Sequence, residues 1–319
     1  MRFLFVMDPA EKMLPDKDTS FAFIRGAEAL GHECLHCLPK DLFNEGPNVF
    51  ASVRSISVSD SAPHTKLGAS SAVELVDLDA VFIRKDPPFD WAYAHLTRQL
   101  DLVKRRVLVL NDPSAIRDAN EKLYAFHFSE FMPRSLVSSD PARLLGFVGT
   151  VGGRAVIKPL DGAGGTGVLA LSLEDQNARS IVDILTKEGQ ELVLVQEYQP
   201  AVRIGDKRVL LLDGQPLGAI LRVPRKDDLR ANIHAGGQVQ PTTLSPGEEK
   251  LVASVGPRLA AVGLSFVGLD LIGEKLIEIN VTSPTGIQEL GRHLGRRPEL
   301  DVIKWVEATS KSRRASAKA

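Results

Sequence analysis

Two pairs of apolar runs in the second half of the chain constrain its fold most, because a short turn joins each pair. Residues 208–212 and 217–223 flank Asp213-Gly214, and Asp-Gly between apolar runs is a strong hairpin signal. Residues 266–272 and 276–281 flank a turn at Gly273. The two predicted hairpins make this half of the chain α+β.

The first third of the chain instead alternates strands and helices. Strands are predicted at 3–7, 32–38, 80–83 and 107–110, and a helix at 20–30. Strands separated by helix-length segments indicate a parallel α/β lobe. Residues 39–72 are polar and show no regular pattern, so we expect a long surface segment of irregular structure that contains one short strand.

The middle of the chain has a different pattern of predicted strands and helices. Strands are predicted at 153–158, 168–171 and 192–196, with a helix at 175–187 between the last two. The segment 224–238 lies between the two hairpins and is rich in Arg, Lys, Asp and Gly. That composition predicts a mobile loop that covers a site.

Composition excludes several classes of protein. A chain of 319 residues suits two or three lobes with separate cores. Its net charge of −1 gives no overall field that would favour nucleic acid or a membrane as partner. No run approaches the roughly 20 apolar residues of a membrane span. The chain also begins with an apolar strand rather than a signal peptide, so we expect a cytoplasmic protein.

The two cysteines form a C-x-x-C sequence, Cys34 and Cys37, inside a predicted strand. Side chains alternate faces along a strand, so a spacing of three places these thiols on opposite sides. A redox C-x-x-C needs its first cysteine at the N-terminus of a helix. We therefore expect core or surface thiols rather than a redox or zinc site.

A glycine loop follows Lys158: Gly162-Ala163-Gly164-Gly165-Thr166-Gly167. It matches G-x-G-x-x-G, but a dinucleotide-binding loop opens a helix, and here a β-like run follows. It also lacks the G-K-[ST] of a Walker A loop, and the lysine precedes the loop, unlike in kinases. Two alternatives remain: a turn between strands, and a loop whose backbone N–H groups approach phosphate oxygens beside Lys158.

The second hairpin is acidic. Glu278 and Asn280 lie two residues apart on one strand and therefore share a face. A three-residue loop at Gly273-Glu274-Lys275 would place Asp270 opposite Glu278, and like charges in that position destabilise a sheet unless a cation compensates. Two carboxylates and an amide oxygen suit Mg²⁺ beside nucleotide phosphates. The alternative is a solvated outer face.

These parts, in this order, resemble the ATP-grasp ligases and the bacterial glutathione synthetases in particular. The most specific runs are Arg-Lys-Asp-Pro-Pro-Phe-Asp at 84–90 and Glu-Ile-Asn-Val-Thr-Ser-Pro-Thr at 278–285. Further matching segments are 7–9, 17–21, 111–113, 120–123, 158–162, 205–209, 232–237 and 267–270. The resemblance spans nearly the whole chain.

The resemblance implies a pre-ATP-grasp α/β lobe at 1–118 that binds substrate, followed by a two-lobed ATP-grasp domain at 119–311. Residues 119–196 would form the central lobe with the glycine loop, and 197–311 the C-terminal lobe with the acidic hairpin. Residues 312–319 would be a disordered basic tail. A homo-oligomer, either a dimer or a tetramer, is also implied.

The resemblance also assigns roles to residues. ATP would be held by Lys122, Lys158, Gly162, Gly164, Gly165, Gly167, Gln196, Glu197, Tyr198 and Asp206. The metal, Mg²⁺ or alternatively Mn²⁺, would be held by Asp270, Glu278 and Asn280. The catalytic residues would be Arg208, which lies near Asp206, and Arg222, Arg230 and Asn232, which face the transferring phosphoryl group and the acyl phosphate. The dipeptide and glycine would be held by Asp18, Ser20, Arg84, Ser283 and Thr285.

The implied reaction joins γ-glutamylcysteine to glycine, with ATP as co-substrate, through an acyl phosphate. It would yield glutathione, ADP and phosphate, with the loop 225–237 excluding water. Three alternatives stay open: another ATP-grasp carboxylate–amine ligase that acts on a peptide or protein, a non-catalytic ATP-binding sensor, and a nucleic-acid module that uses the basic tail. The Arg-Lys-Asp-Pro-Pro run argues against the first alternative. The presence of Lys158 and of every metal ligand argues against the second.

Overall fold

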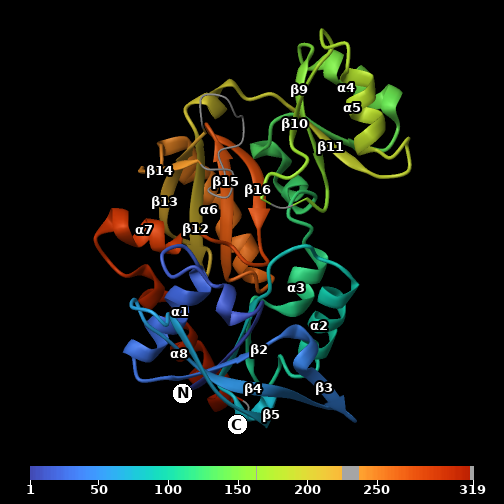
Figure 1. The fold of residues 1–319 in the computed structure, drawn as a ribbon. Coiled ribbons are helices and arrows are strands. Elements are labelled where there is room, and N and C mark those ends of the chain that lie inside the picture. Colours follow the sequence, from blue (N-terminus) through green and yellow to red (C-terminus); the bar gives the residue numbers. More distant parts are fainter. Residues whose placement is uncertain (163, 225–236, 317–319) are drawn as a thin grey trace.

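The protein is described by a computed structural model that covers residues 1–162, 164–224 and 237–316. Three sheets define an N-terminal domain, a central lobe and a C-terminal lobe (Figure 1). Within these residues, no helix is both long and apolar enough to cross a membrane.

The N-terminal domain is built on a seven-stranded sheet in the order β3-β4-β2-β1-β6-β7, with β5 paired to β4. Its parallel part consists of β1 (Arg2–Met7), β2 (Glu33–Cys37), β6 (Ala80–Arg84) and β7 (Leu108–Leu110). The helices of this domain are α1 (Thr19–Ala29), α2 (Trp91–Asp101) and α3 (Pro113–Asp118). The predicted parallel α/β lobe is confirmed.

The prediction for residues 39–72 is wrong. This segment forms β3 (Leu42–Glu45), β4 (Asn48–Val58) and most of β5 (Thr65–Glu74), which pair antiparallel. Val49, Ala51 and Val53 are buried at alternate positions of β4, so a strand signal is present but masked by intervening polar residues. Strand β5 is mostly exposed and carries small side chains, so its sequence shows no apolar alternation.

The central lobe is a four-stranded antiparallel sheet in the order β10-β9-β11-β8. Its strands are β8 (Ser135–Ser138), β9 (Arg154–Pro159), β10 (Leu169–Ser172) and β11 (Val193–Glu197). Helices α4 (Pro141–Thr150) and α5 (Ala178–Leu185) pack on this sheet. Leu144, Ile157 and Val182 belong to a hydrophobic core that this lobe has to itself.

The C-terminal lobe contains both predicted hairpins in one antiparallel sheet of order β14-β13-β12-β15-β16. The strands are β12 (Asp206–Leu212), β13 (Gln215–Val223), β14 (Gln238–Pro241), β15 (Phe266–Ile272) and β16 (Lys275–Asn280). The helices are α6 (Pro246–Ala261), α7 (Ile287–Leu294) and α8 (Pro298–Ser316). Asp213 and Gly214 have φ of 49° and 78°, the backbone of a type I′ hairpin turn.

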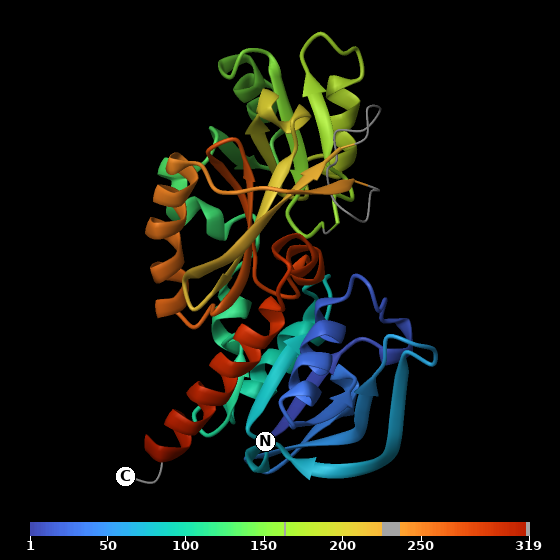
Figure 2. The ribbon, with the colours of Figure 1, turned by 90° about the vertical axis from the view of Figure 1, so that its left-hand side faces the viewer.

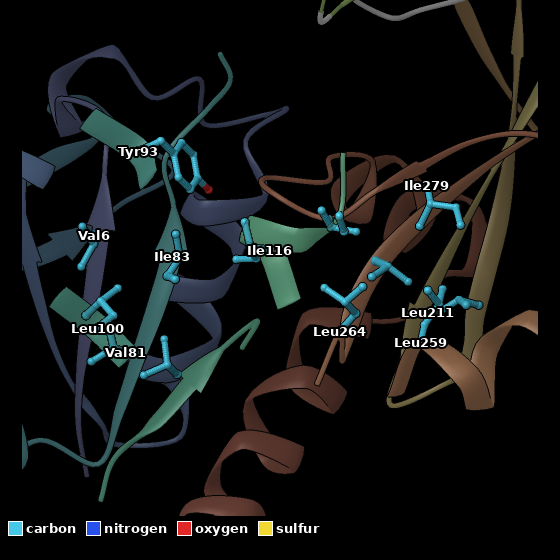
Figure 3. Packing of buried hydrophobic residues seen from close by; sticks show 14 of the residues in the cluster. Val6, Val81, Ile83, Tyr93, Leu100, Ile116, Leu211, Leu259, Leu264 and Ile279 are labelled. Atoms are coloured by element: carbon cyan, nitrogen blue, oxygen red, sulfur yellow. The ribbon is translucent and has the colours of Figure 1, made fainter. Parts of the chain in front are cut away.

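The N-terminal domain and the C-terminal lobe share two hydrophobic clusters, one of which is drawn in Figure 3. Figure 3 shows Val81 and Ile83 on one side, Leu264 and Ile279 on the other, and Ile116 between them. The side chain of Asn111 reinforces this contact. Its Nδ2 donates to the carbonyls of Phe266 at 2.8 Å and Val281 at 2.9 Å, and its Oδ1 accepts from the Phe266 N–H at 2.7 Å.

The basic C-terminal segment is ordered through residue 316, which corrects the prediction of a disordered tail from residue 312. It continues α8, which runs down to the N-terminal domain (Figure 2). Arg313 donates to the carbonyl of Lys104, and Arg314 donates to the carbonyl of Leu78 at 3.0 Å. Arg314 also pairs with Asp79 at 2.8 Å. These charges bind the other domain, a role that composition alone does not reveal.

Cys34 and Cys37 are buried free thiols on opposite faces of β2, as predicted. Cys34 packs into a core cluster with Phe3 and Phe5, whereas Cys37 packs into the cluster that contains Leu4 and Val6. Burial raises the pKa of the Cys34 thiol to about 12 and also raises the pKa of Cys37. Neither thiol is available as a nucleophile at neutral pH.

We expect Asn111→Ala to lower the free energy of unfolding by about 3 kcal/mol. The substitution leaves two carbonyls and one N–H buried without partners, and each costs about 1–3 kcal/mol before relaxation. Urea unfolding measures the change. The control is Asn44→Ala, whose exposed side chain accepts one bond from Gln99 and should change stability by less than about 0.5 kcal/mol. Equal effects of the two substitutions would contradict the role of Asn111.

Candidate active site

One face of the C-terminal sheet carries five of the charged residues that the sequence singled out. Arg222 lies opposite Asp206, and Arg208 lies opposite Asp270. Asp270 in turn lies opposite Glu278 on β16. Side chains opposite one another in an antiparallel pair share a face, so adjacent strands build one continuous charged surface.

Asp270, 6% exposed, is enclosed by two arginines. Arg208 Nη2 donates to Asp270 Oδ2 at 2.9 Å, and Arg222 Nη2 lies 2.9 Å from the same oxygen. Burial opposes ionisation of this carboxyl, but the two guanidinium groups outweigh burial and hold the pKa of Asp270 far below its usual range. Arg222 also pairs with Asp206.

Asp270 faces Glu278 as predicted, but the turn differs from the prediction. Ile272 pairs with Lys275, so the turn has two residues, Gly273 and Glu274. A β-bulge between Asp270 and Leu271 then shifts the register by one residue. The bulge therefore places Asp270 opposite Glu278, as a three-residue loop would also have done. Bulges often re-aim side chains beside active sites, and the sequence carried no signal for this one.

The side chains of Asp270, Glu278 and Asn280 offer oxygen atoms, which are the ligands preferred by the hard cations that bind nucleotide phosphates. Asn280 Nδ2 donates to the carbonyl of Gly268 at 3.2 Å, which leaves the amide oxygen as the atom available for a metal. Within the described ranges no group of three His, Cys, Asp or Glu could hold a metal. Two carboxylates and an amide are too few for a protein-only site, and Mg²⁺ commonly completes its shell with phosphates and water.

Lys158 projects from β9 of the central lobe and is 8% exposed. Its Nζ donates to Gln196 Oε1 on β11 at 3.0 Å. Burial lowers the pKa of Lys158 to about 8, although Glu278, Asp270 and Asp206 oppose the shift. Those three carboxylates belong to the C-terminal lobe, whereas the hydrogen bond of Lys158 is to Gln196 of its own lobe. An anion between the lobes would restore the pKa of the lysine.

Lys122 connects the glycine loop with the acidic hairpin. Its Nζ donates to the carbonyls of Gly162 at 2.6 Å and Leu160 at 3.3 Å, and it lies 3.6 Å from Glu278 Oε1. The loop joins β9 to β10 as predicted, and Gly164, Gly165 and Gly167 have φ of 63°, 80° and 74°. A Cβ at Gly167 would lie 2.7 Å from the Pro159 ring, so both conformation and space require glycine there.

Gln196, Glu197 and Tyr198, which the resemblance assigns to ATP, lie at the end of β11 and directly after it. Gln196 Nε2 donates to Ser135 Oγ at 3.1 Å, which fixes the amide that holds Lys158. Glu197 accepts from the backbone N–H of Arg134 at 3.3 Å. The hydroxyl of Tyr198 is buried without a partner among the described residues, and Arg154 stacks 3.9 Å from the ring centroid. An aromatic face and an unpartnered hydroxyl can contact a nucleotide base.

The five residues predicted to hold substrate gather where the N-terminal domain meets the loop after β16. Arg84 is 5% exposed, and it donates to Ser20 Oγ at 3.2 Å and to the carbonyl of Pro284 at 3.1 Å. The carbonyl of Asp18 accepts from Gln288 at 2.7 Å. Ser283 and Thr285 flank Pro284, and the carbonyl of Thr285 accepts from Arg208 at 3.2 Å. Arg84 therefore touches segments from both domains.

Two predicted residues, Arg230 and Asn232, lie outside the described residues, as does most of the predicted loop 225–237. The described part of that loop is Gly237, which precedes β14.

Glu121 is a site residue that sequence reasoning missed. Its carboxylate accepts from Thr282 Oγ1 at 2.8 Å, in a contact that spans 161 positions of sequence. Burial and the nearby charge of Glu278 raise the pKa of Glu121. The signal available in the sequence was its position beside Lys122, which identifies no partner.

Solved structures establish the class of protein to which this fold belongs. A D-cycloserine synthetase, DcsG, matches 98% of this chain with a TM-score of 0.66 and 15% sequence identity, and all of that chain is covered. The ATP-grasp ligase PsnB, solved with a precursor peptide and AMPPNP, covers 97% of this chain and 98% of its own, with a TM-score of 0.62 and 17% identity. The chain has the ATP-grasp fold that its two antiparallel lobes define.

Sequence comparison identifies the family. The prokaryotic glutathione synthetase N-terminal domain matches residues 1–117, and the ATP-grasp domain of the same family matches residues 121–295. Glutathione synthetase of Gloeobacter violaceus is 42% identical over 96% of both chains. That of Synechocystis is 40% identical over 96% of this chain and 99% of its own. The chain belongs to the prokaryotic glutathione synthetase family, and it is an ATP-dependent ligase.

In the absence of nucleotide and metal, we expect Asp270→Asn to lower the free energy of unfolding at pH 7 by about 3 kcal/mol. The substitution removes the charge that compensates two buried guanidinium groups. Glu278→Gln is the matched control, because Glu278 is more exposed and pairs only loosely with Lys122 at 3.6 Å. It should cost less than about 1 kcal/mol. Chemical denaturation of both variants measures the difference, and equal losses would contradict this assignment of charges.

Proposed function

We propose that this protein joins γ-glutamylcysteine to glycine with ATP, to give glutathione, ADP and phosphate. The observation that carries the proposal is the position of Lys122, whose Nζ donates to the carbonyl of Gly162 in the glycine loop and lies 3.6 Å from Glu278 in the acidic hairpin. Such a site suits an anionic phosphate chain. The family supports the choice of dipeptide and glycine as the substrates.

In the proposed complex, ATP lies between the central and C-terminal lobes. Lys122 and Lys158 bind its phosphates, together with backbone N–H groups of the loop that contains Gly162, Gly164, Gly165 and Gly167. Gln196, Glu197 and Tyr198 contact the adenine, and Asp206 lies near the ribose. The buried hydroxyl of Tyr198 and its stacked ring support the adenine assignment.

Asp270, Glu278 and Asn280 would hold the divalent cation, which we propose to be Mg²⁺, with Mn²⁺ accepted by the same oxygen ligands. The cation would neutralise phosphate charge during transfer. The opposed positions of Asp270 and Glu278 support this set of ligands.

The reaction proceeds in two displacements. An oxygen of the dipeptide's C-terminal carboxylate attacks the γ-phosphorus of ATP, the bond to the β-phosphate oxygen breaks, and ADP leaves. The uncharged amine of glycine then attacks the acyl-phosphate carbonyl, phosphate leaves with the bonding electron pair, and the amine loses its proton. No protein nucleophile is required, so catalysis consists of positioning and charge stabilisation.

The arginines of the charged face supply that stabilisation. Arg222 and Arg208 are fixed by Asp206 and Asp270, so their orientation is set before substrate binds. Arg230 and Asn232 are proposed to act on the same phosphoryl group. Exclusion of water by the loop 225–237 would protect the acyl phosphate from hydrolysis.

The dipeptide and glycine are proposed to bind at Asp18, Ser20, Arg84, Ser283 and Thr285. Arg84 supports this assignment because its guanidinium is buried where the two domains meet. A guanidinium there suits a substrate carboxylate. Ser283 and Thr285 come shortly after β16, the strand that carries Glu278 and Asn280. A substrate held by them would therefore reach the γ-phosphate.

The expected assembly and location are further proposals. A dimer or tetramer of identical chains is supported by the outer edge of β5, which has no strand partner among the described residues. An exposed sheet edge is a ready surface for pairing. A cytoplasmic location is supported by the use of ATP.

We expect ADP release to require γ-glutamylcysteine and to yield stoichiometric glutathione only when glycine is also present. Glu278→Gln should lower kcat by about 100-fold, because it removes one ligand of the proposed cation. A coupled ADP assay with product analysis by mass spectrometry measures both quantities.

The matched control is Glu45→Gln in β3, an exposed position far from the charged face that should keep wild-type kcat. ADP release that ignores the dipeptide would contradict the proposed substrate. Full activity of the Glu278→Gln variant would instead contradict the proposed metal site.

A further inference from the structure

Glu121 makes an unusual set of contacts for a residue in a connecting segment. Its Oε1 accepts from the N–H of Val281 at 3.0 Å, from the N–H of Thr282 at 3.3 Å and from Thr282 Oγ1 at 2.8 Å. Its backbone carbonyl accepts from the N–H of Ile279 at 3.0 Å. Four hydrogen bonds therefore join Glu121 to the end of β16, the strand that carries Glu278 and Asn280, and to the loop that follows it.

On its C-terminal side, Glu121 is covalently linked to the phosphate-binding part of the site. Lys122 follows it directly, donates to the carbonyls of Leu160 and Gly162, and lies close to Glu278. One peptide unit therefore joins the residue that contacts the glycine loop to the residue that contacts Thr282.

Thr282, the hydrogen-bond partner of Glu121, immediately precedes the loop of Ser283 to Thr285 that is proposed to bind substrate. The carbonyl of Pro284, two residues further, accepts from Arg84, which also holds Ser20. A continuous path of bonds thus runs from Lys122 through Glu121 and Thr282 to Arg84.

We propose that Glu121 is a positioning residue whose contacts with Thr282 make the binding of ATP and of the acyl substrate mutually dependent. The proposal rests on the function proposed above. In this role Glu121 holds the loop of Ser283 and Thr285 in register with Lys122. ATP bound at Lys122 therefore orders the dipeptide site. Because coupling is reciprocal, the dipeptide tightens ATP binding by the same factor.

Isothermal titration calorimetry on the full-length protein tests the proposal. The dissociation constant of γ-glutamylcysteine is measured with and without saturating AMPPNP and Mg²⁺, and the ratio is the coupling factor. The reverse titration, AMPPNP with and without dipeptide, must give the same factor. We expect at least fivefold coupling in the wild type, within the range usual for coupled sites.

Three variants separate positioning from simple stabilisation. Glu121→Ala and Thr282→Val should each reduce the factor below about twofold, because each removes the contact between the Thr282 hydroxyl and the carboxylate. Thr282→Ser keeps the hydroxyl and should keep the coupling. Thr282→Val loses a single side-chain hydrogen bond, so it provides the test if Glu121→Ala does not fold.

The outcomes are distinguishable. A coupling factor near one in the wild type, or an unchanged factor in Thr282→Val and Glu121→Ala with only a lower melting temperature, overturns the proposal. A wild-type protein that binds AMPPNP but not γ-glutamylcysteine would instead overturn the proposed substrate.

Discussion

The candidate active site depends on the enclosure of Asp270 by Arg208 and Arg222. A carboxylate so far from water would lose its charge without these partners, and the guanidinium groups would be equally costly without the carboxylate. Cross-strand register places all three side chains on one sheet face, so the antiparallel pairing determines the chemistry. Glu278 and Asn280 extend the same face, and Lys122 Nζ lies 3.6 Å from Glu278 Oε1.

The lobes differ in how firmly they are held. The N-terminal domain and the C-terminal lobe share a core, and Asn111, Arg84 and α8 join them further. The central lobe has its own core, and its glycine loop contacts Lys122, which also lies 3.6 Å from Glu278 of the C-terminal lobe. The glycine loop and Lys158 therefore sit on a separately packed unit, whereas the charged face and the residues proposed to bind the dipeptide belong to domains that share a core.

Local patterns predicted much of this arrangement. The Asp-Gly turn predicted the first hairpin. The alternation of side chains along a strand predicted that Glu278 and Asn280 share a face, with Asp270 opposite Glu278. Features that depend on distant parts of the chain were not predictable: the bulge beside Asp270, the docking of Arg313 and Arg314, and the contact of Glu121 with Thr282. Strand β5 was missed because small, exposed residues show no apolar alternation. The identity of the substrate came from family resemblance, since no side-chain pattern specifies a dipeptide.

The most direct test of the central claim is a crystal structure of the protein with AMPPNP and Mn²⁺, with anomalous data collected to locate the metal. The account predicts an anomalous peak in contact with Asp270, Glu278 and Asn280, beside phosphates that also contact Lys122 and Lys158. A metal bound elsewhere, with the acidic hairpin facing only solvent, would contradict it.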